Sequence, residues 1–219
     1  MEMADIRREY TLAGLRRKDL ETNPLRQFQK WFEEAVRLLT PAGAEASADV
    51  NAMTLATADT HGRPSSRIVL LKGINDHGFV FYTNYNSRKG RELAENPHAA
   101  ITMFWPSQER QICASGLIVK SAVEDSEAYF KSRPRGSQLA AWASHQSEVV
   151  PDRATLESRL RELEAKHADG PVPRPPHWGG FILMPDRVEF WQGRPNRLHD
   201  RFRYSRQPGG SWLLERLAP

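Results

Sequence analysis

Four short segments carry side chains suited to binding anionic groups. The first, residues 67–72 with the sequence RIVLLK, is an apolar run with a cation at each end, Arg67 and Lys72. A strand of this length spans roughly 17 Å, so the two cations would lie apart and could hold two different anions. Strands also commonly end in cations that simply face water, and the segment alone does not separate the two readings.

The second segment, residues 82–89 with the sequence YTNYNSRK, joins a predicted strand to a predicted helix. Ser87, Arg88 and Lys89 stand where the first helical turn presents free backbone N–H groups, an arrangement suited to a phosphate. Ordinary capping by Ser87 explains part of the pattern. Two consecutive cations in the first turn oppose the helix dipole, however, and this conflict indicates a bound anion.

The third group, Tyr129, Arg133 and Ser137, is spaced by four residues. These side chains would share one face of a helix and form a second phosphate site if the helix continued past Pro134. A polar helix surface explains the same spacing equally well.

The fourth segment is the aromatic run 189–193 (EFWQG) followed by residues 197–201 (RLHDR). Arg197, His199 and Arg201 alternate, so they would share one face of an extended segment close to Trp191. A solvated strand edge is the alternative, and the aromatic strand beside it favours a functional face.

The elements that position these segments are mostly strands. Asn23, Pro24 and apolar residues at helical spacing predict a capped amphipathic helix over residues 24–39. A second, short helix should open at Ser87 and end near residue 96. Alternating apolar residues and turn signals predict strands over residues 53–58, 65–72 and 79–83, joined as an antiparallel meander, and over residues 99–105 and 111–122.

Helical pieces follow over residues 125–167, broken near Pro134 and Pro151. Strands are then predicted over residues 180–184, 187–192, 202–204 and 212–216. About eight strands with inserted helices predict a mainly β fold with peripheral helices (α+β), built on a small barrel. Neither βαβ alternation nor a GxGxxG loop occurs, so a Rossmann-type dinucleotide site is disfavoured.

Composition limits the function classes. The chain has 219 residues, a formal charge of +4 and one cysteine, Cys113, which excludes an intramolecular disulfide and a CxxC motif. The N-terminal residues lack the apolar core of a signal peptide, and no stretch is long enough to cross a bilayer, so we expect a cytoplasmic protein without membrane contact. Arginines gather in short clusters rather than along one helix, so we expect anionic metabolites, and no nucleic acid, as partners.

Read together, the segments resemble the pyridoxamine 5′-phosphate oxidase family from residues 7–10 (RREY) to the C-terminus. The blocks that carry the resemblance are residues 67–72, 81–84, 87–89, 132–135, 143–147, 178–181, 189–193 and 197–201. The resemblance implies an FMN-binding split β-barrel, with residues 1–22 as an arm that closes over the active site and residues 23–219 as a single domain with inserted helices. It also implies a homodimer with FMN at the subunit interface.

The same resemblance assigns roles to individual residues. The flavin site would comprise Arg67, Ile68, Lys72, Tyr82, Thr83, Arg88, Lys89, Gln111, Gln146, Ser147, Trp191 and Arg201. The substrate phosphate would meet Lys72, Tyr129, Arg133 and Ser137, and the pyridine ring would face the catalytic pair Arg197 and His199. Arg7 and Tyr10 would belong to the closing arm, and Asp49 would be an active-site acid. No metal is expected.

The implied activity is oxidation of pyridoxamine 5′-phosphate and pyridoxine 5′-phosphate to pyridoxal 5′-phosphate. A hydride would pass from the substrate C4′ to the flavin N5, and O2 would reoxidise the flavin and yield H2O2. The protein would mainly orient the reacting atoms and exclude water. Two alternatives stay open: a split-barrel flavoprotein that acts on another substrate, and a vitamin, heme or flavin carrier without turnover.

Overall fold

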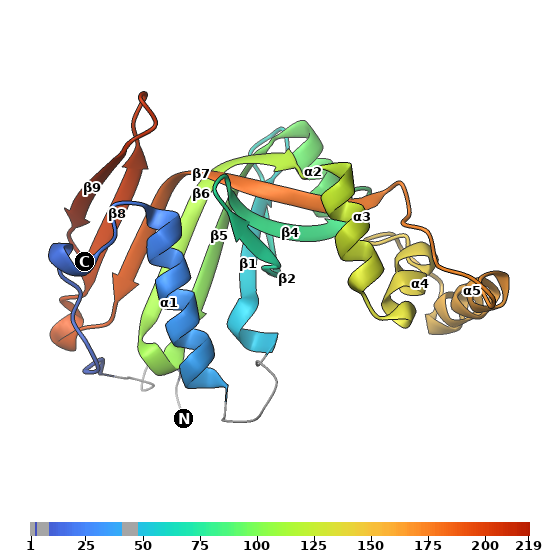
Figure 1. The fold of residues 1–219 in the computed structure, drawn as a ribbon, viewed down its shortest axis with the longest axis horizontal. Coiled ribbons are helices and arrows are strands. Elements are labelled where there is room, and N and C mark those ends of the chain that lie inside the picture. Colours follow the sequence, from blue (N-terminus) through green and yellow to red (C-terminus); the bar gives the residue numbers. More distant parts are fainter. Residues whose placement is uncertain (1–2, 4–8, 41–47) are drawn as a thin grey trace.

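The computed structural model describes residue 3, residues 9–40 and residues 48–219. Within this part, nine strands form one curled antiparallel sheet that carries five α-helices (Figure 1). The strands are β1 (Ala52–Ala58), β2 (Pro64–Leu70), β3 (Gly73–Asn75), β4 (Gly78–Asn84), β5 (His98–Trp105), β6 (Arg110–Lys120), β7 (Trp178–Gln192), β8 (Asp200–Arg206) and β9 (Trp212–Leu217). The α-helices are α1 (Pro24–Leu39), α2 (Arg88–Glu95), α3 (Val123–Ser132), α4 (Arg135–Ala143) and α5 (Arg153–Lys166).

The sheet curls so that its two ends approach each other. Its main path runs β2-β1-β5-β6-β7-β4-β3, and β8 and β9 extend it from β7. A register shift at Ser115 and Gly116 interrupts the pairing of β6 with β7, as bulges do where a sheet bends. The backbone N–H of Lys72, just after β2, donates to the carbonyl of Val80 on β4 at 2.8 Å. In the described part of the chain, β2 pairs with β1 alone and β4 pairs with β3 and β7, so the barrel is open along a seam between β2 and β4.

The predicted meander is correct for its first hairpin and wrong for its last strand. β1 pairs with β2, as expected, but β4 pairs with β3 and with β7, and not with β2. The reason is burial: Phe79 and Phe81 of β4 are fully buried, and Phe81 packs on Phe181 of β7 with ring centroids 5.7 Å apart. Local turn signals do not reveal a partner nearly one hundred residues away.

The helix α1 covers one side of the curled sheet (Figure 1). Asn23 caps it by accepting from the N–H of Leu25 at 2.8 Å, which confirms the predicted cap. Phe28 and Trp31 point into the core, where Trp31 meets Phe190 edge to face at 5.1 Å. The amphipathic pattern of the sequence thus determines which face of the helix is buried.

The helices α3, α4 and α5 form an arm at the far end of the molecule from β8 and β9 (Figure 1). α3 ends at Ser132 and α4 begins at Arg135, so the predicted break at Pro134 is confirmed.

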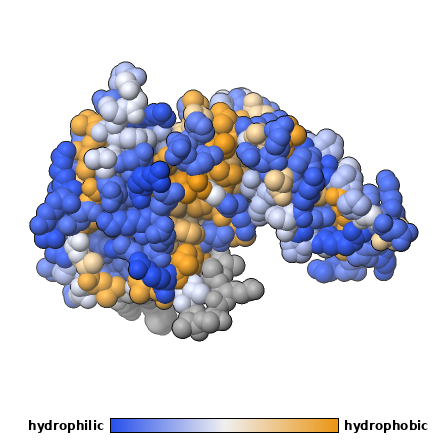
Figure 2. Space-filling model, viewed as in Figure 1, coloured by the Kyte–Doolittle hydropathy of each residue, from blue (hydrophilic) through white to orange (hydrophobic). Residues whose placement is uncertain are grey.

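Between this helical arm and α1, the surface over the sheet is apolar (Figure 2). Ile68, Leu70 and Phe104 are among the large apolar side chains that remain exposed.

Candidate functional site

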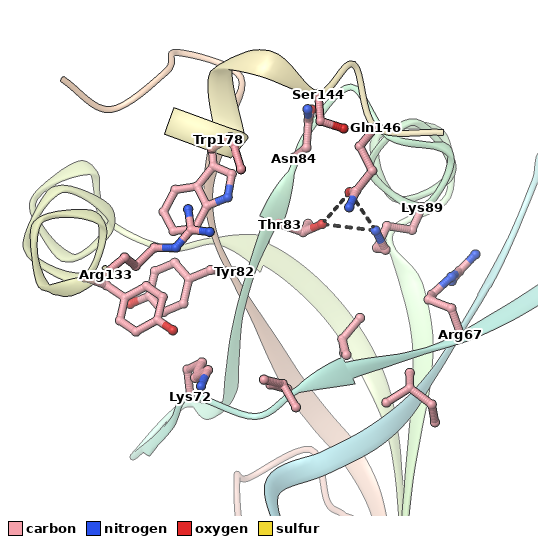
Figure 3. A pocket seen from close by; sticks show the side chains of 16 residues that line it. Arg67, Lys72, Tyr82, Thr83, Asn84, Lys89, Arg133, Ser144, Gln146 and Trp178 are labelled. Atoms are coloured by element: carbon pink, nitrogen blue, oxygen red, sulfur yellow. Dashed lines mark hydrogen bonds between the residues drawn. The ribbon is translucent and has the colours of Figure 1, made fainter. Parts of the chain in front are cut away.

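A cavity of about 490 Å³ lies at the seam of the barrel, between β2 and β4 and beneath the helical arm (Figure 3). Its volume is in the range of pockets that hold small molecules and cofactors. The lining residues are Arg67, Ile68, Val69, Leu70, Lys72, Tyr82, Thr83, Asn84, Lys89, Tyr129, Arg133, Ala140, Ala141, Ser144, Gln146 and Trp178. They come from β2, β4, α2, α3, α4, the first residue of β7 and the segments that directly follow β2, α3 and α4.

The cavity brings together much of the predicted site. Seven residues expected at the flavin line it, namely Arg67, Ile68, Lys72, Tyr82, Thr83, Lys89 and Gln146. Tyr129 and Arg133 of the expected phosphate group join them. Figure 3 shows Arg67 and Lys89 at one side and Lys72 and Arg133 at the other. Two pairs of cations therefore face one cavity from opposite ends.

Lys89 is a buried ammonium without an acidic partner among the described residues. It is 8% exposed, and its Nζ donates to Gln146 Oε1 at 3.0 Å and Thr83 Oγ1 at 3.1 Å, with Ser87 Oγ at 3.4 Å. Burial, together with the nearby positive charge of Arg67, lowers the lysine pKa to about 8. A buried cation held only by neutral oxygens is a favourable place for an anion.

Three aromatic rings form a stack at the opposite end of the cavity. The Tyr82 ring lies 4.0 Å from that of Tyr129 and 5.6 Å from that of Trp178, and the rings of Tyr129 and Trp178 are 6.1 Å apart; all three are parallel to within 18°. The Arg133 guanidinium lies 4.6 Å from the Trp178 ring, and its buried Nη1 has no hydrogen-bond partner in the described part of the chain. Burial lowers the pKa of Arg133. This guanidinium is thus held in place by an aromatic face and keeps an N–H group for a ligand.

A second cluster of predicted site residues gathers around Trp191. The ring of His199 lies 4.6 Å from that of Trp191, and Tyr10 packs edge to face on both, at 5.4 Å from Trp191 and 5.7 Å from His199. The backbone N–H of Arg194 donates to His199 Nδ1 at 3.1 Å, so a neutral His199 carries its hydrogen on Nε2. Burial and the charge of Arg197 lower the pKa of His199, which favours this neutral form.

Gln111 and Arg201 belong to the same cluster by strand register. Trp191 pairs with Gln111 of β6 on one side and with Arg201 of β8 on the other. Arg201 also binds the Glu189 carboxylate, at 2.7 and 3.1 Å.

The predicted extended face over residues 197–201 is wrong. Arg197 closes a short 3-10 turn (Pro195–Arg197) with a φ of 62°, and β8 begins only at Asp200. Pro195 favours such a turn. The exposed Arg197 lies in this turn, so its direction does not follow the alternation of β8.

The cavity and the Trp191 cluster lie at opposite ends of β7. Trp178 begins this strand and Trp191 comes thirteen residues later. At about 3.3 Å per residue, the path along the strand from one to the other is roughly 40 Å, and none of Tyr10, Gln111, Trp191, His199 and Arg201 lines the cavity. One chain therefore does not bring both halves of the predicted site onto a single small molecule.

The other predicted residues lie around the cavity or outside the described part. Ser137, on α4, and the exposed Ser147, with a φ of 75°, are not among the lining residues. Arg88 is exposed beside the cavity and binds Glu92 at 2.8 Å. Arg7 lies outside the described residues. Asp49 belongs to the 3-10 turn Ala48–Asn51, but its side chain is outside the described part.

Trp178, Asn84, Ser144 and Glu92 were not predicted at the site. The first three line the cavity, and Glu92 is a buried carboxylate behind Arg67. Trp178 could have been suspected, since it opens the block 178–181 that carries the family resemblance, but its stacking partners come from β4 and α3. In the described part of the chain, no group of three or more His, Cys, Asp or Glu side chains is placed to hold a metal ion. The described helices include none with the length and apolar character to span a membrane.

Two segments of the chain match known protein families. Residues 39–167 match the pyridoxamine 5′-phosphate oxidase family, and residues 178–219 match the pyridoxine 5′-phosphate oxidase C-terminal dimerisation region. Pyridoxine/pyridoxamine 5′-phosphate oxidase 1 of Ralstonia nicotianae is 56% identical over 217 residues, and the corresponding oxidase of Paraburkholderia phymatum is 52% identical over 217 residues. Each alignment covers 99% of this chain and 99% of the relative.

Two solved structures have the same fold. PhzG of Burkholderia lata, in complex with tetrahydrophenazine-1-carboxylic acid, is 32% identical and matches with a TM-score of 0.86, covering 95% of this chain and 100% of its own. A pyridoxamine 5′-phosphate oxidase-related, FMN-binding protein of Nostoc punctiforme is 19% identical, with a TM-score of 0.69, covering 90% and 98%. The predicted split-barrel fold is confirmed.

Proposed function

The chain belongs to the pyridoxamine 5′-phosphate oxidase family, and from this premise we propose that it oxidises pyridoxamine 5′-phosphate and pyridoxine 5′-phosphate to pyridoxal 5′-phosphate. FMN is its cofactor and supplies the redox chemistry when bound. O2 is the electron acceptor in this proposal, and H2O2 the second product.

The observation that carries the proposal is the presence of two cationic ends in one cavity. Arg67 and Lys89 lie at one end, and Lys72 and Arg133 lie at the other, where Tyr82 also lies (Figure 3). Both the cofactor and the substrate carry a phosphate, so a site that holds them side by side needs two separate anion-binding ends. Two groups suit a bound phosphate. In the described part of the chain, Arg133 Nη1 has no hydrogen-bond partner, and the Lys89 ammonium has no acidic partner.

At the cofactor end, Lys89 and Arg67 would bind the FMN phosphate, and Thr83 and Gln146 would keep the Lys89 side chain directed toward it. At the substrate end, Arg133 and Lys72 would bind the substrate phosphate. Trp178 fixes the Arg133 guanidinium by its ring face, so this cation is oriented before the substrate arrives.

The Trp191 cluster would complete the site from the second subunit. The chain forms a homodimer, as its C-terminal dimerisation region indicates. Because β7 separates Trp191 from the cavity of its own chain, we place FMN at the subunit interface, with Gln111, Trp191 and Arg201 supplied by the partner chain. The exposed Ile68 at the cavity rim fits burial by such a partner.

His199 and Arg197 would then face the substrate ring from the partner's side. His199 can donate from Nε2, because its Nδ1 already accepts from the Arg194 N–H. Arg197 adds a positive charge, and neither group needs to form a covalent bond. Residues 1–22 would act as the arm: Tyr10 rests on Trp191 and His199, where it would shield this side of the site from water.

The test is direct. The purified protein should show a flavin spectrum, and addition of pyridoxamine 5′-phosphate in air should give pyridoxal 5′-phosphate with matching O2 uptake. Without O2 the flavin absorbance should bleach. A yellow protein that leaves this substrate unchanged would refute the activity and point to the alternative of a split-barrel flavoprotein with another substrate.

A further inference from the structure

Behind the cofactor end of the cavity lies a buried carboxylate, Glu92, on the face of α2 that also carries Lys89. Glu92 is 6% exposed and is held from several sides. Burial opposes its ionisation, but hydrogen bonds from Ser65, Thr57 and Arg88 outweigh that effect and lower its pKa to about 2. The side chain is therefore a carboxylate throughout the working pH range of a protein.

Glu92 reaches two arginines through its two oxygens. Oε1 accepts from Arg88 Nε at 2.8 Å, one helical turn earlier on α2. Oε2 lies 3.4 Å from Arg67 Nη2 on β2. The carboxylate thus joins the helix that carries Lys89 to the strand that lines the opposite wall of the cavity.

Two hydroxyl groups connect Arg67 to the same oxygen. Ser65 Oγ donates to Glu92 Oε2 at 2.6 Å and accepts from Arg67 Nη2 at 2.5 Å. Thr57 Oγ1 also donates to Oε2 and accepts from Arg67 Nη1 at 2.7 Å. Since a carboxylate only accepts, it directs both hydroxyl hydrogens toward itself and leaves their lone pairs to Arg67. The orientation of the guanidinium depends on this charge.

The terminal N–H groups of Arg67 are thereby occupied. Nη1 donates to Thr57 and also to the Leu55 carbonyl at 3.2 Å, and Nη2 donates to Ser65 and Glu92. In the described part of the chain, its Nε–H has no protein partner, which leaves this group and the charge of Arg67 for a ligand.

The charges also balance with a phosphate. Arg67, Arg88, Lys89 and Glu92 together carry two net positive charges around one end of the cavity. A phosphate monoester carries about two negative charges near pH 7. Without Glu92 the charges of the three cations would be uncompensated, and Arg67 would lose one acceptor together with the carboxylate that orients the hydroxyls of Thr57 and Ser65.

We propose that Glu92 is a positioning residue for the cofactor phosphate: it holds Arg67 and Arg88 in the orientation in which they and Lys89 bind that group. This inference rests on the proposed function, since it takes FMN as the occupant of the cavity. Glu92 does not line the cavity, so it would touch neither the phosphate nor the reacting atoms. Replacing Glu92 should therefore weaken the binding of a flavin that carries a phosphate and spare one that lacks it. A purely structural role would affect both flavins equally.

The experiment compares FMN with riboflavin, which has the same ring system and no phosphate. Apoprotein is titrated with each flavin, and binding is followed by quenching of flavin fluorescence. The variants are Glu92→Gln, which keeps the shape without the charge, and Ser65→Ala, which removes one connecting hydroxyl. Glu95→Gln, an exposed carboxamide substitution on the same helix, is the matched control. Thermal unfolding of each apoprotein checks the fold.

We expect Glu92→Gln to weaken FMN binding about tenfold and Ser65→Ala about threefold, with riboflavin affinity within about twofold of the parent. In an Arg67→Ala background, Glu92→Gln should weaken FMN binding less than it does in the parent, because one of the two arginines that Glu92 holds is absent. Equal loss of FMN and riboflavin affinity would show a scaffold role and overturn the proposal, as would unchanged or tighter FMN binding.

If Glu92→Gln does not fold, the same outcomes in Ser65→Ala decide the question. The failure of the proposed function looks different, because the folded parent protein would then bind FMN but leave pyridoxamine 5′-phosphate unchanged.

Discussion

The affinity of the apoprotein for FMN should fall as the pH rises through 8, because of Lys89. Its Nζ contacts only neutral oxygens, and burial lowers its pKa from 10.5 to about 8. A bound phosphate dianion would stabilise the ammonium and raise this pKa again. Well below pH 8 both the free and the bound protein carry the proton on Lys89, so this lysine contributes no pH dependence there.

Above pH 8 the free protein loses the proton while the FMN complex keeps it. Binding then requires uptake of one proton, and the association constant falls toward a factor of ten for each pH unit. Between pH 7 and pH 9 we expect roughly a tenfold loss of affinity, or about 1.4 kcal/mol.

The assay is a fluorescence titration of apoprotein with FMN at several pH values between 7 and 9. Lys89→Met should bind FMN weakly, with no pH dependence in this window. Lys89→Arg should bind FMN with an affinity that does not change with pH, because a guanidinium stays protonated. Riboflavin should show no such dependence with the parent. If the parent affinity for FMN is constant from pH 7 to pH 9, or if Lys89→Met shows the same slope as the parent, the assignment of the phosphate to Lys89 is incorrect.

Two further predictions concern the substrate and the arm. Arg197→Ala should lower kcat/KM by about 10- to 100-fold with flavin retained, whereas Arg67→Ala should chiefly weaken flavin retention. Steady-state kinetics, measured together with flavin absorbance, checks both variants, and full turnover in Arg197→Ala would show that Arg197 has no role in the reaction. Gly193→Ala should raise KM several-fold, because a Cβ there would lie 2.7 Å from Tyr10 and displace the arm. Gly209→Ala, where a Cβ meets nothing within 4 Å, is the control, and equal KM values in the two variants would contradict the packing argument.

Local patterns in the sequence determined much of the framework. Asn23 caps α1 and Ser87 caps α2, and both caps form as predicted because they involve only neighbouring backbone groups. The alternation of apolar residues located most strands to within a few residues. Residues 180–184 and 187–192 were wrongly predicted as two strands, because they form the single strand β7, and the short β3 was not predicted. The break at Pro134 was equally local, since the proline restricts the residue before it.

The anion-binding character of the site could also be predicted from residue types. Arg67, Lys72 and Lys89 stood out as cations at strand and helix ends, and the structure places all three around one cavity. The family resemblance supplied the connection between these segments, which spacing alone did not provide.

Only the tertiary structure decided which segments meet. β4 pairs with β7 rather than with β2, and this pairing opens the seam in which the cavity lies. Glu92 shows the same limit. Glu92 follows Arg88 by four residues, which is the spacing of an ordinary ion pair on a helix surface. Its burial and its contacts with the hydroxyls of Thr57 and Ser65 depend on strands that the spacing does not reveal. Spacing along one element fixes neighbours on that element, whereas burial and charge balance depend on strands that return from elsewhere in the chain.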